Sequence, residues 1–202
     1  MPNDPISDHP ATWRFDYEVI HAETRDQWRK WLAANSASAR GVWLCSWRTP
    51  TGRPRCPYPD AVEEAICFGW IDSTSTILDD DRNLQLFTPR KGKSSWTRLN
   101  RSRAAEMEER GLMTESGRAA IAAAKATGWW TILDSVEDLE EPADLAAALD
   151  GDPIARANWD GFPPSARKFM LWGVVSAVRD TTRAERIARI VAEAAEGRRA
   201  QG

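Results

Sequence analysis

Residues 58–73 decide the fold and read Tyr58-Pro59-Asp60-Ala61-Val62-Glu63-Glu64-Ala65-Ile66-Cys67-Phe68-Gly69-Trp70-Ile71-Asp72-Ser73. Ala61, Ala65 and Phe68 recur with helical spacing, and Gly69 can adopt the positive φ that ends a helix. The β-branched run that follows favours a strand up to Leu78, and a polar turn then leads into an alternating return strand over residues 84–88. The stretch therefore predicts a helix followed by a β-hairpin.

A basic segment follows the hairpin, and residues 87–103 read Phe87-Thr88-Pro89-Arg90-Lys91-Gly92-Lys93-Ser94-Ser95-Trp96-Thr97-Arg98-Leu99-Asn100-Arg101-Ser102-Arg103. Residues 90–103 carry six basic side chains and no acidic one. Either Ser94 or Ser95 is expected to cap a helix that runs to Arg110. A helix N-terminus beside basic side chains favours an anion.

We expect the two segments to form one polar site. Asp72 should then lie within about 8 Å of the guanidinium of Arg90 or Arg103, because screened charges interact usefully only at short range. Two interpretations remain open: a closed structural cluster of ion pairs, or a pocket for a small anionic ligand or an acidic peptide. The candidate ligand-binding residues are Glu64, Trp70, Asp72, Arg90, Lys91, Ser95, Trp96, Asn100 and Arg103.

Both segments resemble the YdeI/OmpD-associated, bacteriocin-protection-like family, whose members read roughly EEAxCFGWIDS, FxPRK and SxWSxxNxxR. Thr97 stands where the family has serine and keeps the hydroxyl. The C-terminal part is similar to the family's OmdA-type segment at Pro142-Ala143-Asp144-Leu145, Pro164-Ser165-Ala166-Arg167 and Thr182-Arg183-Ala184-Glu185-Arg186-Ile187. The resemblance covers residues 15–198. It implies a binding or stress-protection protein and carries no established chemistry.

The fold class is predicted as α+β, with an N-terminal antiparallel sheet flanked by helices and a small all-helical C-terminal domain. Strands are expected over residues 13–20 and 41–47, and a capping box of Thr24 and Gln27 is expected to open the helix between them, which ends near Asn35. The expected division is a flexible N-terminal arm at 1–12, an α+β domain at 13–138 and a helical OmdA-like domain at 139–202.

Two connecting segments carry further expectations. Residues 49–59 contain four prolines and two arginines, so they form a loop that could cover the central site as a flap. The acidic stretch at 134–141 is interpreted as a linker, which the family resemblance implies to be short and partly ordered. A second capping box is predicted at Thr182 and Glu185.

Composition limits the remaining function classes. The 202 residues have a net charge of -3, which argues against a general nucleic-acid-binding surface. Three cysteines with no close pair and two histidines near the N-terminus predict no structural metal and no cofactor. The lack of a signal peptide or a membrane-length apolar run predicts a cytoplasmic protein with no membrane span. A monomer or weak dimer is expected.

No catalytic motif is recognised, so the chain is more consistent with a binding protein than with an enzyme. One alternative is a cofactor-free enzyme that uses Asp72 or Glu64 with Arg90. Glu63 and Glu64 point about 100° apart on a helix, which weakens that alternative. Another is a protein–protein interaction module with only structural ion pairs. Trp70 and Trp96 could line a pocket or fill the core, and Cys67 is expected to be a small buried hydrophobe.

Overall fold

The computed structural model describes residues 17–200, and these form two compact units. Unit 1 comprises residues 17–94 and 99–127, and unit 2 comprises residues 95–98 and 128–200. The expected arm at 1–12 and the start of the expected strand at 13–20 lie outside the described residues. The units divide near residue 128, whereas the sequence-based domain boundary at 138 stays a prediction.

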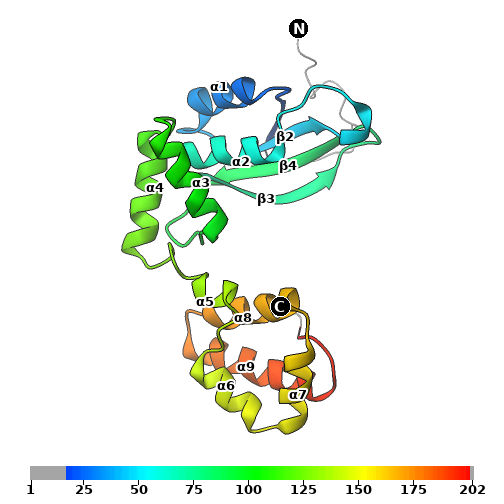
Figure 1. The fold of residues 1–202 in the computed structure, drawn as a ribbon. Helices are drawn as coiled ribbons and strands as arrows, with labels where there is room; N and C mark the ends of the chain where they lie inside the picture. Colours follow the sequence, from blue (N-terminus) through cyan, green and yellow to red (C-terminus); the bar gives the residue numbers. More distant parts are fainter. Residues whose placement is uncertain (1–16, 201–202) are drawn as a thin grey trace. The chain divides into compact units, whose positions relative to one another are not determined.

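Unit 1 is built on a four-stranded sheet in the order β1-β2-β4-β3 (Figure 1). The strands are β1 (Glu18–His21), β2 (Val42–Trp47), β3 (Trp70–Ile77) and β4 (Arg82–Pro89). The α+β fold class is confirmed. The expectation of an antiparallel sheet holds for β2, β3 and β4 and is wrong for β1, which pairs parallel to β2. Helix α1 lies between β1 and β2 in the chain and makes the crossover that a parallel pair requires.

Helices α1 (Arg25–Asn35) and α2 (Tyr58–Cys67) pack together and lie along one face of this sheet (Figure 1). The capping box that opens α1 is confirmed, because Thr24 accepts from the Gln27 amide while the Gln27 side chain accepts from the Thr24 amide. Trp28 of α1 is fully buried, and its ring lies 5.1 Å from the Phe87 ring of β4. A short 3-10 turn, η2 (Thr49–Thr51), interrupts the proline-rich loop.

The helix after the basic segment starts later than expected. Helix α3 spans Arg98–Glu109, so neither Ser94 nor Ser95 caps it and that prediction is wrong. Ser94 instead closes a turn, in which its amide donates to the Lys91 carbonyl oxygen at 2.9 Å. Its hydroxyl also accepts from the guanidinium of Arg90 at 3.4 Å. The amide and the hydroxyl of Ser94 are therefore used within this turn and do not cap a helix.

The N-terminus of α4 (Glu115–Ala126) meets the end of α2. Thr114 caps α4 by accepting from the Gly117 amide, and both the amide and the hydroxyl of Thr114 donate to the Cys67 carbonyl oxygen, at 3.1 and 2.6 Å. A Cβ atom at Gly117 would lie 2.3 Å from that oxygen. Gly69 ends α2 with φ of 75°, as expected. Glycine at 117 therefore allows the two helix ends to approach.

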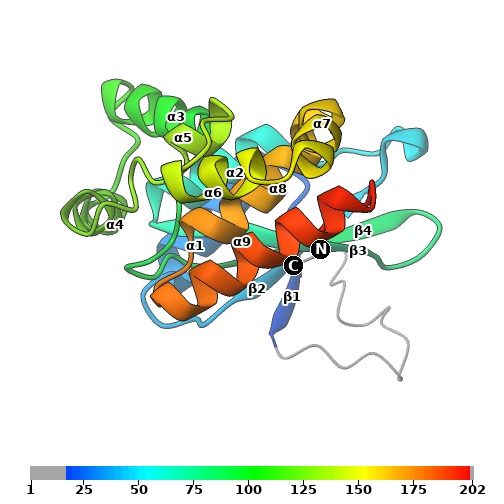
Figure 2. The ribbon, with the colours of Figure 1, turned by 90° about the horizontal axis from the view of Figure 1, so that it is seen from below.

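Unit 2 is all-helical, and its longest helix, α9, contacts α6, α7 and α8 (Figure 2). Leu145, Leu149, Trp159 and Leu171 are fully buried in its core. The capping box predicted at Thr182 is wrong, since α9 begins two residues earlier. The helices are α5 (Asp134–Glu137), α6 (Ala143–Asp150), α7 (Pro153–Gly161), α8 (Pro164–Val175) and α9 (Asp180–Ala195).

The expectation that the acidic stretch at 134–141 is partly ordered agrees with the structure. Its first half forms α5, and the guanidinium of Arg98 pairs with the carboxylates of Asp138 and Glu137. Glu141 accepts from Arg156 at 2.8 Å and from the indole of Trp159 at 2.7 Å. Paired carboxylates do not repel one another as an unpaired acidic run would, so the chain can fold here.

Between residues 17 and 200, no helix is long and apolar enough to cross a membrane.

Candidate functional site

The face of the sheet that carries α2 also forms a polar groove beside the start of that helix. Its first section has a volume of about 420 Å³ and lies between β2, β3 and β4 and the segment that leads into α2. A second section of about 380 Å³ shares Arg55, Ser75 and Asn83 with it. We call both together the sheet groove. Its first section is lined by Leu44, Ser46, Arg55, Cys56, Tyr58, Ala61, Asp72, Ser73, Ser75, Asn83, Gln85 and Phe87.

Strand register explains why these side chains meet. Leu44 is paired with Gln85 and Ser46 with Asn83, and residues two apart on a strand share a face. Ser75 lies on the other side of Gln85. This face is therefore apolar at the Val42 end of β2, where α1 and α2 cover it, and polar at the other end. The polar end is the groove.

A β-bulge shapes the β3 side of the groove. The pairing of β3 with β4 shifts between Asp72 and Ser75. The side-chain amide of Gln85 donates to the carbonyl oxygens of Ser73 and Thr74, at 3.3 and 3.2 Å. A bulge changes the direction of the side chains next to it. Asp72 and Ser75 therefore both line the groove although they are three residues apart.

Tyr58 and Asp72 form a short hydrogen bond in the groove. The phenol hydroxyl of Tyr58 donates to Oδ2 of Asp72 at 2.5 Å. Burial and this hydrogen bond raise the pKa of Tyr58 to about 12, and the cation Arg103 partly opposes the rise. The phenol thus remains protonated at neutral pH. Asp72 keeps further acceptor capacity for a ligand, because a carboxylate has about four lone-pair sites.

Arg55 is the cation that lines both sections of the groove. Its guanidinium is exposed and makes no ion pair or hydrogen bond with any residue in the described part of the chain. Arg48 is the second cation of the smaller section, and its guanidinium donates to the Asp80 carbonyl oxygen at 2.8 Å. No carboxylate lines that section among the described residues. The sheet groove therefore has a positive end at Arg48 and Arg55 and an acceptor end at Asp72.

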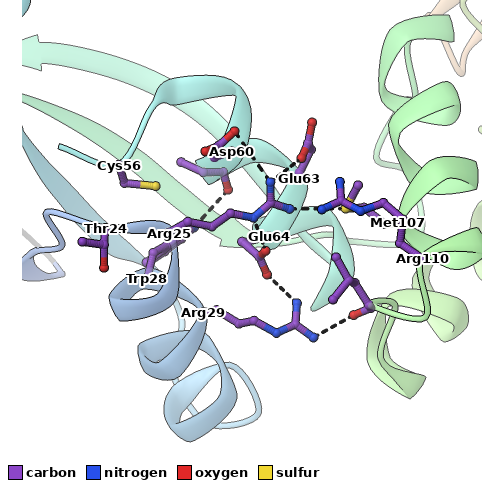
Figure 3. Close-up of polar contacts among 12 residues, drawn as sticks. Thr24, Arg25, Trp28, Arg29, Cys56, Asp60, Glu63, Glu64, Met107 and Arg110 are labelled. Carbon is purple, nitrogen blue, oxygen red and sulfur yellow. Dashed lines mark hydrogen bonds and ion pairs between the residues drawn. The ribbon is translucent and has the colours of Figure 1, made fainter.

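Glu64 lies outside the groove, in an ion-pair cluster between α1 and α2 (Figure 3). It is 1% exposed, and its two carboxylate oxygens accept from Arg25 Nε at 2.6 Å and Arg29 Nη1 at 2.5 Å. Arg25 also pairs with Glu63 at 2.7 Å, while Arg29 donates to the Leu112 carbonyl oxygen at 2.8 Å. We call these four charged residues the Glu64 cluster. It joins α1, α2 and the turn that follows α3, which supports the structural interpretation for Glu64.

The protonation of the arginines reflects these contacts. Burial alone would lower the pKa of Arg25, but hydrogen bonds to Glu64 and Glu63 outweigh burial and raise it. The pKa of Arg29 is raised for the same reason, with Glu64 as the main partner. Both arginines therefore remain charged at neutral pH.

Trp70 and Arg90 are packed next to each other at the start of β3. Trp70 is 1% exposed and packs against Trp31, so it belongs to the core. Arg90 donates from Nε to the Trp70 carbonyl oxygen at 3.2 Å, and its amide donates to the Gly69 carbonyl oxygen. Burial lowers the pKa of Arg90 to about 10, and the charge of Asp72 offsets part of that effect. Arg90 thus interacts electrostatically with Asp72, without lining the groove.

The remaining predicted site residues are divided between the two units. Lys91 is exposed, and Arg103 donates to Oδ1 of Asn100 at 3.1 Å along α3. Ser95 and Trp96 belong to unit 2, where the buried ring of Trp96 lies 5.0 Å from the Trp130 ring. The ligand-binding role of all nine residues stays a prediction.

The thiols of Cys56 and Cys67 are poor nucleophiles. Burial and the carboxylate of Asp60 raise the pKa of Cys56, which lines the groove, to about 12. Burial and Glu64 raise the pKa of Cys67 to about 11. Both are therefore protonated at neutral pH, and nucleophilic attack needs the thiolate.

His21 is partly buried at the sheet edge. Its ring lies 4.9 Å from the Trp47 ring, and neither ring nitrogen has a hydrogen-bond partner in the described chain. Burial lowers the pKa of His21; Arg82 acts in the same direction and Glu23 opposes it. The neutral form is thus favoured in the folded protein.

Replacing His21 with phenylalanine should reduce the pH dependence of stability. The unfolded chain binds a proton near the ordinary histidine pKa of about 6.5, and the folded chain binds it only at lower pH. Neutral His21 therefore costs the folded protein no stability above pH about 6.5. As the pH falls below this value, the unfolded chain gains a proton that the folded chain does not, and the free energy of unfolding decreases. Denaturant unfolding at pH 7.5 and at lower pH measures this loss. A His9→Gln variant should retain the full loss, and an unchanged pH profile in His21→Phe would contradict the assignment.

Several residues of the sheet groove were not predicted as site residues. Arg55 and Tyr58 appear in the sequence as part of a loop and a helix start, while Asn83 and Gln85 appear as ordinary hairpin residues. On one face of the sheet, β2 changes from Leu44 to Ser46 and β4 changes from Phe87 to Gln85. This change from apolar to polar residues is the sequence signal that could have predicted the groove. It shows a sheet face that becomes polar along its length.

The comparisons with known proteins identify two families. Residues 20–120, half of the chain, match the model of a family described as a domain of unknown function (DUF8412), and the chain belongs to that family. Residues 138–197 match the OmdA family, described as bacteriocin-protection, YdeI or OmpD-associated. This confirms the resemblance for the C-terminal part, while the groove lies within the first match. No curated protein and no solved structure matches the chain.

Proposed function

We propose that the chain is a binding protein whose sheet groove takes a small polar ligand with an anionic group at one end. The supporting observation is the guanidinium of Arg55, which lines both sections of the groove and has no ion-pair or hydrogen-bond partner among residues 17–200. Guanidinium groups bind carboxylates and phosphates through charge-assisted hydrogen bonds. The anionic group would lie between Arg48 and Arg55. A role in protection from stress rests on the description of the OmdA family alone.

The opposite end of the groove restricts the ligand further. Asp72 accepts from Tyr58 and can accept again, so it favours a ligand that carries a donor or a positive charge. An amino acid with an acidic side chain has both features, whereas a plain dicarboxylate has only the anionic one. The groove thus favours a small zwitterion over a dianion.

The catalytic alternative gains no support from this geometry. Glu64 is enclosed by two arginines, and neither Glu64 nor Arg90 lines the groove that contains Asp72. The alternative of a protein–protein interaction module with only structural ion pairs agrees with the Glu64 cluster. It does not explain why the guanidinium of Arg55 lines the groove.

Thermal unfolding of the full chain with L-glutamate, glutarate and inorganic phosphate tests the proposal. A ligand that binds only the folded state stabilises it by about 1.4 kcal/mol at ten times its Kd. We expect glutamate to stabilise the wild type more than glutarate. Arg55→Gln should abolish this stabilisation, and Asp72→Asn should remove the difference between the two compounds.

Arg40→Gln is the matched control, because Arg40 is an exposed arginine of unit 1 that does not line the groove. It should respond to glutamate as the wild type does. Equal responses of Arg55→Gln and Arg40→Gln would mean that the groove does not hold the anion.

A further inference from the structure

Unit 2 contains a hollow with a volume of about 650 Å³. It lies between the second half of α8 and the middle of α9. Phe169, Trp172 and Gly173 line it from α8, where residues three and four apart share one side of a helix, and Ser176 lines it directly after that helix. We call it the α8–α9 groove. Its volume is within the range of small-molecule sites.

The floor of this groove is apolar. Met170 and Ile190 are almost fully buried beneath it, and Ala200 lies beside them. Phe169 is 56% exposed, so a large part of its ring faces solvent at the groove. An aromatic ring at a hollow with an apolar floor can contact the apolar body of a ligand.

Charged groups form the rim. Arg186 is half-buried, and its Nη1 donates to the Gly173 carbonyl oxygen and to the Ser176 hydroxyl. These bonds hold the guanidinium at the groove, and no carboxylate of the described chain pairs with it. Arg189 is exposed and forms no salt bridge within residues 17–200, although it interacts electrostatically with Glu193 on the next turn of α9. Glu185 is the one carboxylate among the described lining residues.

We propose that the α8–α9 groove binds an amphiphilic monocarboxylate, which is a molecule with one apolar body and one carboxylate. The body lies against Phe169, Trp172 and Ile190, and the carboxylate accepts from Arg186 and Arg189. Two cations and one anion on the rim leave one positive charge, which a single carboxylate neutralises. Charge-assisted bonds to a guanidinium that is already positioned cost little side-chain ordering. This site is independent of the sheet groove.

NMR titration of the full chain with decanoate and 1-decanol tests the proposal, with the indole N–H signal of Trp172 as the reporter. We expect decanoate to shift this signal and to bind at least about tenfold more tightly than 1-decanol, the same chain without the charge. Arg189→Gln should weaken decanoate binding, and so should Arg186→Gln, while Arg186→Lys should retain part of the affinity.

A blocking variant separates the groove from general apolar binding. A Cβ atom at Gly173 would meet no atom within 4 Å, so Gly173→Leu places its side chain in open space at the groove. Gly161, at the end of α7, has the same free surroundings and does not line the groove. Decanoate should bind Gly161→Leu as it binds the wild type and should fail to bind Gly173→Leu. Equal binding to both variants, or equal affinity for decanoate and 1-decanol, would overturn the proposal.

Discussion

Replacing Glu64 with glutamine is expected to lower the free energy of unfolding by about 3 kcal/mol. The Glu64 side chain is 2% exposed and accepts from two guanidinium groups. Glutamine keeps the shape but removes the charge, so Arg25 and Arg29 remain partly buried without it. The effect should lie at the lower end of the range for a broken buried pair, because Arg25 keeps its contact with Glu63 at 2.7 Å. Denaturant unfolding with a linear extrapolation measures the change.

Glu106→Gln is the matched control for this prediction. Glu106 pairs with Arg110 on the surface of α3, where both side chains are about half exposed. Solvent screens such a pair, so the expected loss is about 0.5 kcal/mol or less. A double-mutant cycle of Glu64→Gln with Arg29→Gln should show that the two losses are not additive. A loss in Glu64→Gln no larger than in the control would refute the structural role of the Glu64 cluster.

Replacing Gly117 with alanine is expected to destabilise the protein by about 2–3 kcal/mol, although alanine is the better helix former. The added Cβ would lie 2.3 Å from the Cys67 carbonyl oxygen and 2.4 Å from the Met113 sulfur. The sulfur can move, but the backbone oxygen is fixed by its hydrogen bonds to Thr114. The end of α2 and the start of α4 would have to separate. We expect the denaturant concentration at the unfolding midpoint to fall, while the dependence of the unfolding free energy on denaturant concentration stays the same.

Gly173→Ala provides the opposite result in the same measurement. Gly173 is also helical, and an added Cβ would meet nothing within 4 Å. Alanine should therefore stabilise the protein by about 0.5–1 kcal/mol through a less flexible unfolded chain. If both glycines gave the same sign, close approach at Cys67 would not be the reason for glycine at 117.

The elements of unit 1 could be predicted from the sequence because their signals are local. The helical spacing from Ala61 to Phe68 and the glycine at 69 define α2, and the polar turn at 79–83 defines the hairpin of β3 and β4. The parallel pairing of β1 has no such local signal, because it depends on where the crossover through α1 returns the chain. The start of α3 also could not be predicted locally. The same residues allow either a Ser94 cap or a turn from Lys91 to Ser94, and the sequence does not show which of the two forms.

The site was harder to predict because its partners are distant in the chain. Glu64 was recognised as unusual, but its partners Arg25 and Arg29 come 39 and 35 residues earlier in the chain. Sequence reasoning instead paired the acidic motif with the basic segment that follows it. The electrostatic interaction of Asp72 with Arg90 agrees with that idea in part. Arg55 lies in a proline-rich loop, where nothing in the sequence indicates which way its side chain points.

The bulge in β3 has a consequence for the solubility of the protein. β3 is an edge strand of the sheet, and an edge with regularly alternating amide and carbonyl groups can recruit a strand from another molecule. In a regular strand two consecutive carbonyl groups point to opposite sides, yet those of Ser73 and Thr74 both accept from the one amide of Gln85. The edge therefore lacks a regular ladder at its centre. Gln85 thereby helps to keep separate copies of the chain from joining edge to edge into larger aggregates.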